Sequence, residues 1–196
     1  MPGSFDRLPP AFNFRPVLPG RLYRSAEPVL LAPHDWTALV SDIGLTTVVD
    51  LRMTAEQAQR GLQPPTQGVT VWSLPLFEEP WPGWSDPEDR APRAAAARYL
   101  EMLETGASVV RRIAALLKSP EAGPTLVHCA AGRDRTGIVV ACLLALEGWS
   151  DGAIATDYAL SDGVVPDGRR AEPATMRELL ALVRRCHGSV DQLLIR

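Results

Sequence analysis

The sequence predicts an α/β fold, a single domain in which helices flank a central, mostly parallel sheet of four to five strands. Short β-branched and apolar segments alternate along the chain with segments whose apolar residues recur at helical spacing. Strands that alternate with helices pair in parallel, with helices on both faces of the sheet. The chain of 196 residues is long enough to bury one complete core, so we expect one domain over residues 1–196.

The first elements are expected to be an irregular arm, the start of the sheet and a helix. Residues 1–20 contain many prolines and little periodicity, and Leu22 and Tyr23 then begin or flank the sheet. A helix follows from Pro33, because proline is favoured in the first helical turn. It ends at Gly44, because glycine is favoured just after the last turn.

The rest of the chain continues the alternation of strands and helices. β-branched and apolar runs predict strands at residues 46–51, 69–74 and 125–128. Helical periodicity predicts helices at residues 92–104, 107–118, 138–146, 151–161 and 172–187. The connection at residues 75–92 contains Trp81, Trp84 and five acidic residues. Structureless connections of this length usually carry function, so we expect a lid or a binding loop there.

The composition argues against several classes of protein. The net charge is −3 and there is no block of basic residues, so no nucleic-acid partner is expected. No apolar run is long enough for stable membrane insertion, and the first residues lack the features of a signal peptide, so a cytoplasmic location is expected. Cys129, Cys142 and Cys186 match neither a disulfide framework nor metal-ligand spacing. Reduced thiols and no metal or cofactor are expected, and the oligomeric state stays open.

One stretch carries most of the chemistry: Thr125-Leu-Val-His-Cys-Ala-Ala-Gly-Arg-Asp-Arg-Thr-Gly137. It predicts a buried strand, a tight loop and a helix. Such a loop turns backbone N–H groups inward at the positive end of the helix, which makes a site for phosphate. Cys129 lies in this field, which favours the thiolate. Arg135 follows six positions later, where its planar fork can hold two phosphoryl oxygens. Gly132 allows backbone angles that other residues resist.

This stretch resembles the active-site loop of cysteine-dependent protein phosphatases, which reads His-Cys, five residues, Arg and then Ser or Thr. The Asp-Arg-Thr-Gly ending resembles the bacterial tyrosine/serine phosphatase branch, which has a member that also accepts phosphoinositides. Three further segments are similar to that branch: Gly20-Arg-Leu-Tyr-Arg-Ser25, Val48-Val-Asp-Leu-Arg52 and Ala155-Thr-Asp-Tyr-Ala-Leu-Ser161. The similarity covers most of residues 13–165. Where the branch has a lysine before the loop aspartate, this chain has Arg133, which keeps the charge.

The expected activity is hydrolysis of phosphotyrosine, with phosphoserine, phosphothreonine and phosphoinositides as further candidate substrates. Cys129 would attack phosphorus to form a phosphocysteine, which water then hydrolyses without a metal. Arg135 and the loop amides would stabilise the charge on the equatorial oxygens. The residues expected to bind the phosphorylated protein or phosphoinositide are Ala130, Ala131, Gly132, Arg133, Thr136 and Asp50.

The general acid has two candidate positions. A leaving group of high pKa needs a proton from a carboxylic acid within hydrogen-bond reach. In the branch that the chain resembles, the loop aspartate is the favoured donor, which corresponds to Asp134. In classical tyrosine phosphatases the donor lies on a separate loop, which would nominate Asp86 or Asp89. We favour Asp134.

Other residues near the loop also have more than one interpretation. Thr136 either caps the helix or donates a hydrogen bond to the sulfur. Asp50 lies at the carboxyl end of a strand, where α/β sheets place ligands, and it either braces the loop arginine, touches the substrate or pairs with Arg52. Arg133 points to solvent or to a second anionic group of the ligand. His128 is expected to brace the loop through a bond to the backbone.

Two other functions compete with phosphoester hydrolysis. Thiol-based sulfurtransferases and arsenate reductases also use a cysteine in an anion-binding loop, but they usually lack an arginine at this spacing or need a resolving cysteine nearby. Cys142 is expected in the core and Cys186 near a helix end, so neither is favoured as that partner. A catalytically silent phosphate-binding module is the other alternative, and the retention of Cys129, Arg135 and a candidate acid argues against it.

Overall fold

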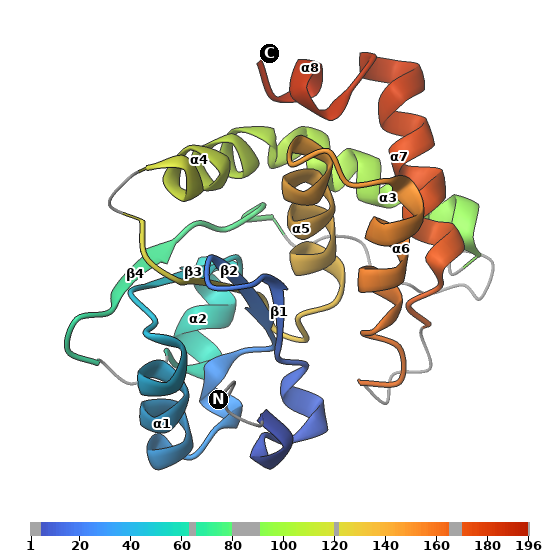
Figure 1. Ribbon diagram of the computed structural model, residues 1–196. Helices are drawn as coiled ribbons and strands as arrows, with labels where there is room; N and C mark the ends of the chain where they lie inside the picture. Colours follow the sequence, from blue (N-terminus) through green and yellow to red (C-terminus); the bar gives the residue numbers. More distant parts are fainter. Residues whose placement is uncertain (1–4, 63–65, 80–90, 120–121, 165–169, 196) are drawn as a thin grey trace.

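A five-stranded sheet crosses the molecule (Figure 1). The strands of this computed structural model are β1 (Arg15–Leu18), β2 (Leu22–Ser25), β3 (Thr47–Asp50), β4 (Thr70–Ser73) and β5 (Thr125–His128). Their order is β1-β2-β5-β3-β4, with β1 antiparallel to β2 and the other pairs parallel. The predicted fold class is therefore confirmed. The structure describes residues 5–62, 66–79, 91–119, 122–164 and 170–195.

Helices cover both faces of the sheet. The helices are α1 (Pro33–Ile43), α2 (Thr54–Arg60), α3 (Pro92–Thr105), α4 (Ala107–Lys118), α5 (Asp134–Leu146), α6 (Asp151–Ala159), α7 (Pro173–His187) and α8 (Val190–Ile195). Short 3₁₀ turns lie at Phe5–Arg7, Pro10–Phe12 and Pro28–Leu30. In Figure 1, α1 and α2 lie on one side of the sheet, and α3 to α8 lie on the other.

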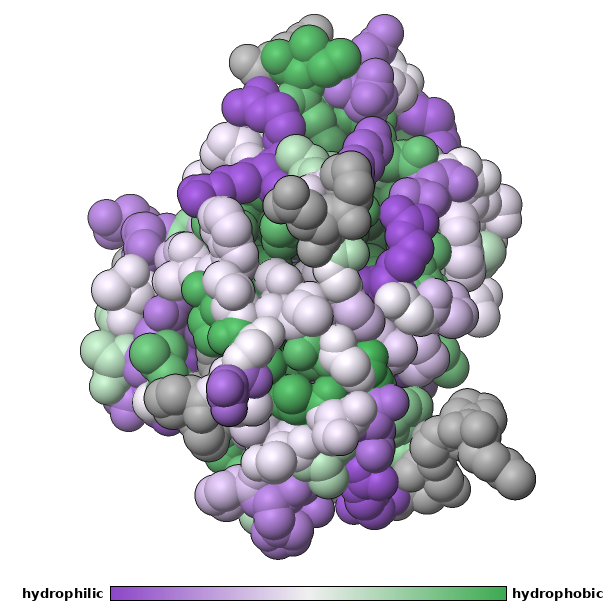
Figure 2. Space-filling view, turned by 60° about the vertical axis from the view of Figure 1, so that its left-hand side comes forward, coloured by the Kyte–Doolittle hydropathy of each residue, from purple (hydrophilic) through white to green (hydrophobic). Residues whose placement is uncertain are grey.

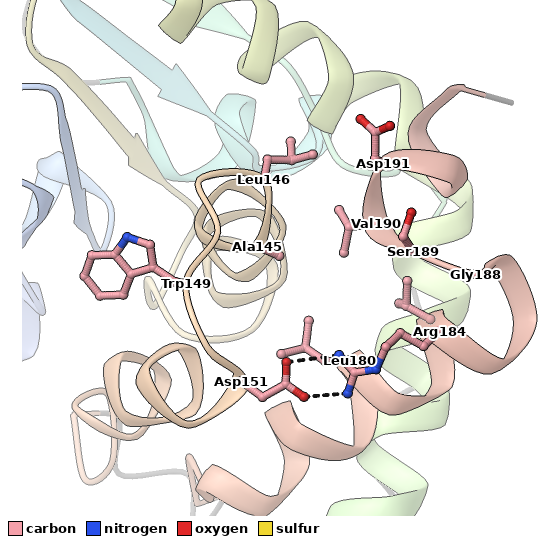
Figure 3. A pocket seen from close by; sticks show the side chains of 11 residues that line it. Ala145, Leu146, Trp149, Asp151, Leu180, Arg184, Gly188, Ser189, Val190 and Asp191 are labelled. Carbon is pink, nitrogen blue, oxygen red and sulfur yellow. Dashed lines mark hydrogen bonds and ion pairs between the residues drawn. The ribbon is translucent and has the colours of Figure 1, made fainter.

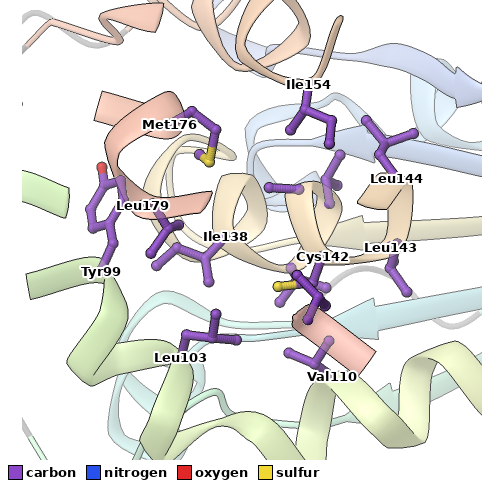
Figure 4. Packing of buried hydrophobic residues seen from close by; sticks show 14 of the residues in the cluster. Tyr99, Leu103, Val110, Ile138, Cys142, Leu143, Leu144, Ile154, Met176 and Leu179 are labelled. Carbon is purple, nitrogen blue, oxygen red and sulfur yellow. The ribbon is translucent and has the colours of Figure 1, made fainter. Parts of the chain in front are cut away.

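The larger core forms around α5, the helix that follows the loop after β5. Buried residues occupy α5 without a break from Thr136 to Leu144, as expected for a helix that is apolar on all sides. Side chains from α3, α4, α6 and α7 surround it in Figure 4. Cys142 lies in this core as predicted, and burial raises the pKa of its thiol to about 12. The start of α5 is thus held by the larger of the two buried clusters.

Three sequence predictions need correction. Residues 15–18 do not belong to an irregular arm but form β1, because proline is tolerated at the edge of a sheet, where Pro16 lies opposite Tyr23. The helix expected at 138–146 begins earlier, at Asp134. The helices α2 and α8 were not predicted. Helix α2 has no buried residue, so its sequence shows no apolar period.

The surface shows no extended apolar belt on the face drawn in Figure 2, where hydrophobic residues form separate patches between hydrophilic ones. Within the described ranges, no helix combines the length and the apolar character that a membrane span requires.

Candidate active site

The motif lies where three parallel strands end side by side. The register pairs His128 of β5 with Ser25 of β2 on one side and with Asp50 of β3 on the other. Cys129 follows β5 directly, and α5 begins five residues later at Asp134. Cys129 is 2% exposed. The loop between them therefore rests on the carboxyl edge of the sheet, at the N-terminus of a buried helix.

Gly132 fixes the shape of the loop. Its φ is +67°, a conformation that side chains disfavour, and an added Cβ would lie 2.3 Å from the Ser25 carbonyl oxygen. The Gly132 carbonyl accepts hydrogen bonds from the Arg24 guanidinium at 2.7 Å and from Asn13 Nδ2 at 3.1 Å. The Ala130 carbonyl accepts one from the Glu27 amide at 3.0 Å. These contacts hold loop carbonyls away from the space that the loop encloses.

A polar network behind the loop joins two of the segments that resemble the phosphatases. Arg24 Nη1 donates to the Asp157 carboxylate on α6, and Arg15 Nε donates to the same carboxylate at 3.0 Å. The Ser161 hydroxyl accepts from Asn13 Nδ2 at 3.1 Å. Burial, followed by the charge of Arg24, lowers the pKa of Arg15 to about 10, so Arg15 remains charged at neutral pH. The two arginines fasten β1 and β2 to α6.

Arg135 is held by a carboxylate that the sequence analysis did not identify. Its two terminal nitrogens donate to the two oxygens of Glu56 on α2, one of them at 2.9 Å. The side chains of Arg135 and Glu56 are 13% and 18% exposed. Burial opposes both charges, but the hydrogen bonds and charge of Arg135 outweigh it and lower the pKa of Glu56. Burial likewise acts against the charge of Arg135, but its hydrogen bonds to Glu56, followed by the electrostatic interaction with Cys129, outweigh burial and raise the pKa of Arg135.

Glu56 binds the two terminal nitrogens of Arg135. The Nε–H lies on another, side-on edge of the planar guanidinium and takes no part in this pair. The Phe77 ring lies 5.6 Å from the guanidinium carbon, so an aromatic face also limits its movement. A local signal for Glu56 does exist: its carboxylate accepts from the Met53 amide at 2.9 Å, the position of a capping glutamate three residues after a helix start.

Asp50 does not brace Arg135, and that prediction is wrong. Its carboxylate accepts from Arg52 Nε at 3.0 Å and from Nη2 at 2.7 Å, and the side chains of both residues are fully buried. Arg52 Nη1 also donates to Glu27 at 2.8 Å. The Asp50 carboxylate is fully buried, and its expected contact with the substrate stays a prediction. The ion pair with Arg52, one of its predicted interpretations, is confirmed.

His128 is a brace, as predicted. Its Nδ1–H donates to the Cys129 carbonyl at 3.1 Å. Burial lowers the pKa of His128 to about 4, so the imidazole is neutral at pH 7.

Asp134 lies at the start of α5 with its side chain 21% exposed. The Tyr99 hydroxyl of α3 donates to it and is itself 3.0 Å from the Tyr158 hydroxyl of α6. Burial and the neighbouring Asp134 raise the pKa of Tyr158 to about 12 and the pKa of Tyr99 well above its usual value, so both phenols stay protonated. Arg133 Nε lies 3.4 Å from Asp134, and the Arg133 side chain is 1% exposed, so it does not point to solvent.

The comparison with known proteins decides the family. A model of the tyrosine phosphatase family matches residues 9–195. The chain belongs to this family. It is 32% identical to the triple specificity protein phosphatase PtpB of Mycobacterium tuberculosis, over 83% of this chain and 71% of PtpB. This protein is therefore a cysteine-dependent tyrosine phosphatase, an enzyme that hydrolyses phosphoesters.

Solved structures agree with the family. P. aeruginosa TpbA is 26% identical and superposes with a TM-score of 0.52, covering 96% of this phosphatase and 92% of TpbA. A Cys-to-Ser variant of TpbA in complex with phosphotyrosine gives a TM-score of 0.51 at the same identity, covering 96% and 91% of the two chains.

Two further predictions concern the role of Thr136 and the alternative general acids. Thr136 is not the helix cap, because the N-cap is Arg133; the Thr136 hydroxyl is fully buried and has no hydrogen-bond partner among the residues that the structure describes. Asp86 and Asp89, the alternative general acids, lie outside the described residues, as do Trp81 and Trp84.

Proposed function

We propose that this phosphatase hydrolyses phosphotyrosine through a phosphocysteine intermediate on Cys129. The observation that carries the proposal is the loop itself: a cysteine and an arginine share one turn at a helix N-terminus, and Glu56 fixes the arginine with both oxygens. The similarity to TpbA, whose Cys-to-Ser variant binds phosphotyrosine, supports the substrate. The similarity to PtpB, a triple specificity phosphatase, supports testing phosphoserine, phosphothreonine and other phosphoesters as well.

In the first step the Cys129 thiolate attacks phosphorus in line with the leaving oxygen. A P–S bond forms as the P–O bond breaks, and the equatorial oxygens are held by the amides from Ala130 to Arg135 and by the side-on edge of the Arg135 fork. Amides aimed at the charge that develops in the transition state supply much of phosphoryl-transfer catalysis. Arg133 adds positive charge beside the loop.

Asp134 is proposed as the proton donor to the leaving oxygen. A positioned acid contributes about a hundredfold or more. The hydroxyl of Tyr99 holds one carboxylate oxygen, and the tyrosine pair anchors this contact to α3 and α6. Tyr99 is therefore a positioning residue for Asp134.

In the second step water attacks phosphorus, the P–S bond breaks, and Asp134 accepts the proton of the water. Cys129 leaves as a thiolate, and the buried Thr136 hydroxyl is proposed to donate to its sulfur. The products are inorganic phosphate and the free alcohol, so the two steps restore the enzyme.

The family assignment favours this activity over sulfur transfer, arsenate reduction and silent phosphate binding. The test is steady-state hydrolysis of a phosphotyrosine peptide, a phosphoserine peptide and a phosphoinositide in buffer that contains a chelator. We expect turnover of phosphotyrosine that is lost in Cys129→Ser, while that variant still binds inorganic phosphate. Turnover that survives the substitution would refute the covalent mechanism.

A further inference from the structure

A cavity of about 220 Å³ adjoins the loop that follows Cys129. Ala130 and Ala131, the two residues after the nucleophile, form part of its wall, together with Ala26 and Leu30. Arg60, the last residue of α2, also lines the cavity. Glu27 lines the cavity as well, so its mainly apolar walls carry the Arg60 guanidinium and the Glu27 carboxylate that pairs with it.

Helix α2 relates this cavity to the site of the phosphoryl group. Glu56 and Arg60 lie four residues apart on α2, so their side chains project from the same face, with Cβ atoms about 6 Å apart. Glu56 holds Arg135, whereas Arg60 lines the cavity. The cavity therefore flanks the phosphate-binding loop on the side of α2, where it can receive the neighbour of a phosphorylated residue.

Arg60 has capacity for a further anionic partner. Its Nη2 contacts Glu27 at 3.2 Å, and its side chain is 49% exposed. Glu27 is buried and already accepts from Arg52 at 2.8 Å with its other oxygen. Among the described residues Arg60 forms no other ion pair, so the rest of its guanidinium faces solvent at the edge of the cavity.

We propose that this cavity is a second substrate subsite, which binds a side chain with an aliphatic stem and an anionic end, such as glutamate, next to the phosphorylated residue. The stem would pack against Leu30 and Ala130, and the carboxylate would accept hydrogen bonds from Arg60. The proposal rests on the proposed hydrolysis of phosphotyrosine peptides and adds a preference for acidic substrates.

The experiment compares phosphotyrosine peptides that carry glutamate or glutamine at each of the positions adjacent to the phosphotyrosine. A half-exposed ion pair predicts that kcat/KM favours glutamate by about fivefold at one position. In Arg60→Ala this ratio should fall to near one, and in Arg60→Glu it should invert. Glu27 keeps its contact with Arg52 in both variants, so the fold should persist, which circular dichroism checks.

Arg184→Ala is the matched control. Arg184 is also about half exposed, and it pairs with Asp151 beside a cavity of about 370 Å³ at the C-terminal end of α5 (Figure 3). This cavity lies at the far end of α5 from the loop, about 18 Å away along the helix axis. Loss of the Arg184 side chain should leave the glutamate preference of the wild type intact.

The possible outcomes distinguish failure of the proposed subsite alone from failure of the proposed phosphotyrosine hydrolysis. A wild type that hydrolyses the peptides without preferring glutamate would overturn the subsite alone, as would a preference that survives in Arg60→Ala. Equal losses on glutamate and glutamine peptides in Arg60→Ala would also overturn it, because they would indicate a purely structural role. A wild type that hydrolyses no phosphotyrosine peptide would overturn the proposed function and the subsite together.

Discussion

Replacement of Glu56 by glutamine tests how Arg135, the proposed catalytic arginine, is held. Glutamate accepts from both terminal nitrogens of Arg135, whereas glutamine can accept through one oxygen only, and its NH₂ group faces a donor. Exposed ion pairs contribute up to about 1 kcal/mol and disrupted buried pairs cost about 3–5 kcal/mol. With side chains 13% and 18% exposed, this pair lies between those limits. We estimate a loss of about 2 kcal/mol in positioning Arg135, or about thirtyfold in kcat/KM.

The assay is kcat/KM on a phosphotyrosine peptide, measured with the affinity for inorganic phosphate. Both should fall together in Glu56→Gln, because Arg135 is proposed to contact the phosphoryl group in both complexes. Glu147→Gln is the control, since Glu147 forms an exposed pair with Arg21 at 3.4 Å and should change kcat/KM by less than about twofold. If Glu56→Gln retains the activity of the wild type, then the pair does not position Arg135 and the argument fails.

The same pair predicts a pH dependence of stability. The pKa of Glu56 is lowered in the folded protein from its usual 4.5, so its charge stabilises the fold above that value. The contribution is lost as pH falls through the folded pKa, because the carboxylate is then protonated in both states. The difference in unfolding free energy between the wild type and Glu56→Gln should therefore shrink in acid. A difference that is the same at pH 7 and in strong acid would contradict this assignment.

The loop and its supports give three further predictions. Gly132→Ala should destabilise the protein by more than about 2 kcal/mol in denaturant unfolding and abolish turnover. Gly148→Ala is the control: its φ is +80°, but nothing lies within 4 Å of the added Cβ, so it should cost only about 1 kcal/mol. Equal costs of the two substitutions would refute the clash with Ser25. Tyr99→Phe should slow hydrolysis of a phosphotyrosine peptide about fivefold more than hydrolysis of p-nitrophenyl phosphate, since only the poor leaving group of the peptide needs the proton of Asp134. Tyr158→Phe should have the smaller effect. Equal losses on both substrates would count against the positioning of Asp134. Arg135→Lys should lower kcat/KM almost as much as Cys129→Ser, because lysine lacks the planar fork, and a mild effect would show that the charge alone suffices.

The chemistry that is local in the chain could be predicted from the sequence. The strand β5, the loop and α5 are contiguous, so the six-residue spacing from Cys129 to Arg135 and the glycine between them already predict a phosphate-binding turn. The apolar spacing of residues 172–187 predicted α7 for the same reason, because a helix that buries one face records its period in its own sequence. Mostly parallel pairing followed from the alternation of strands and helices.

The supports of that loop were decided only by the tertiary structure. Glu56 lies 79 residues from Arg135, Tyr99 lies 35 residues from Asp134, and Asn13 lies 119 residues from Gly132. Helix α2, which carries Glu56, buries no residue and leaves no apolar period to detect. A carboxylate in such a segment has the same local sequence whether it faces solvent or an arginine, so its partner is fixed by packing alone. The sequence thus indicated which residues we propose to react, and the fold decided which residues hold them.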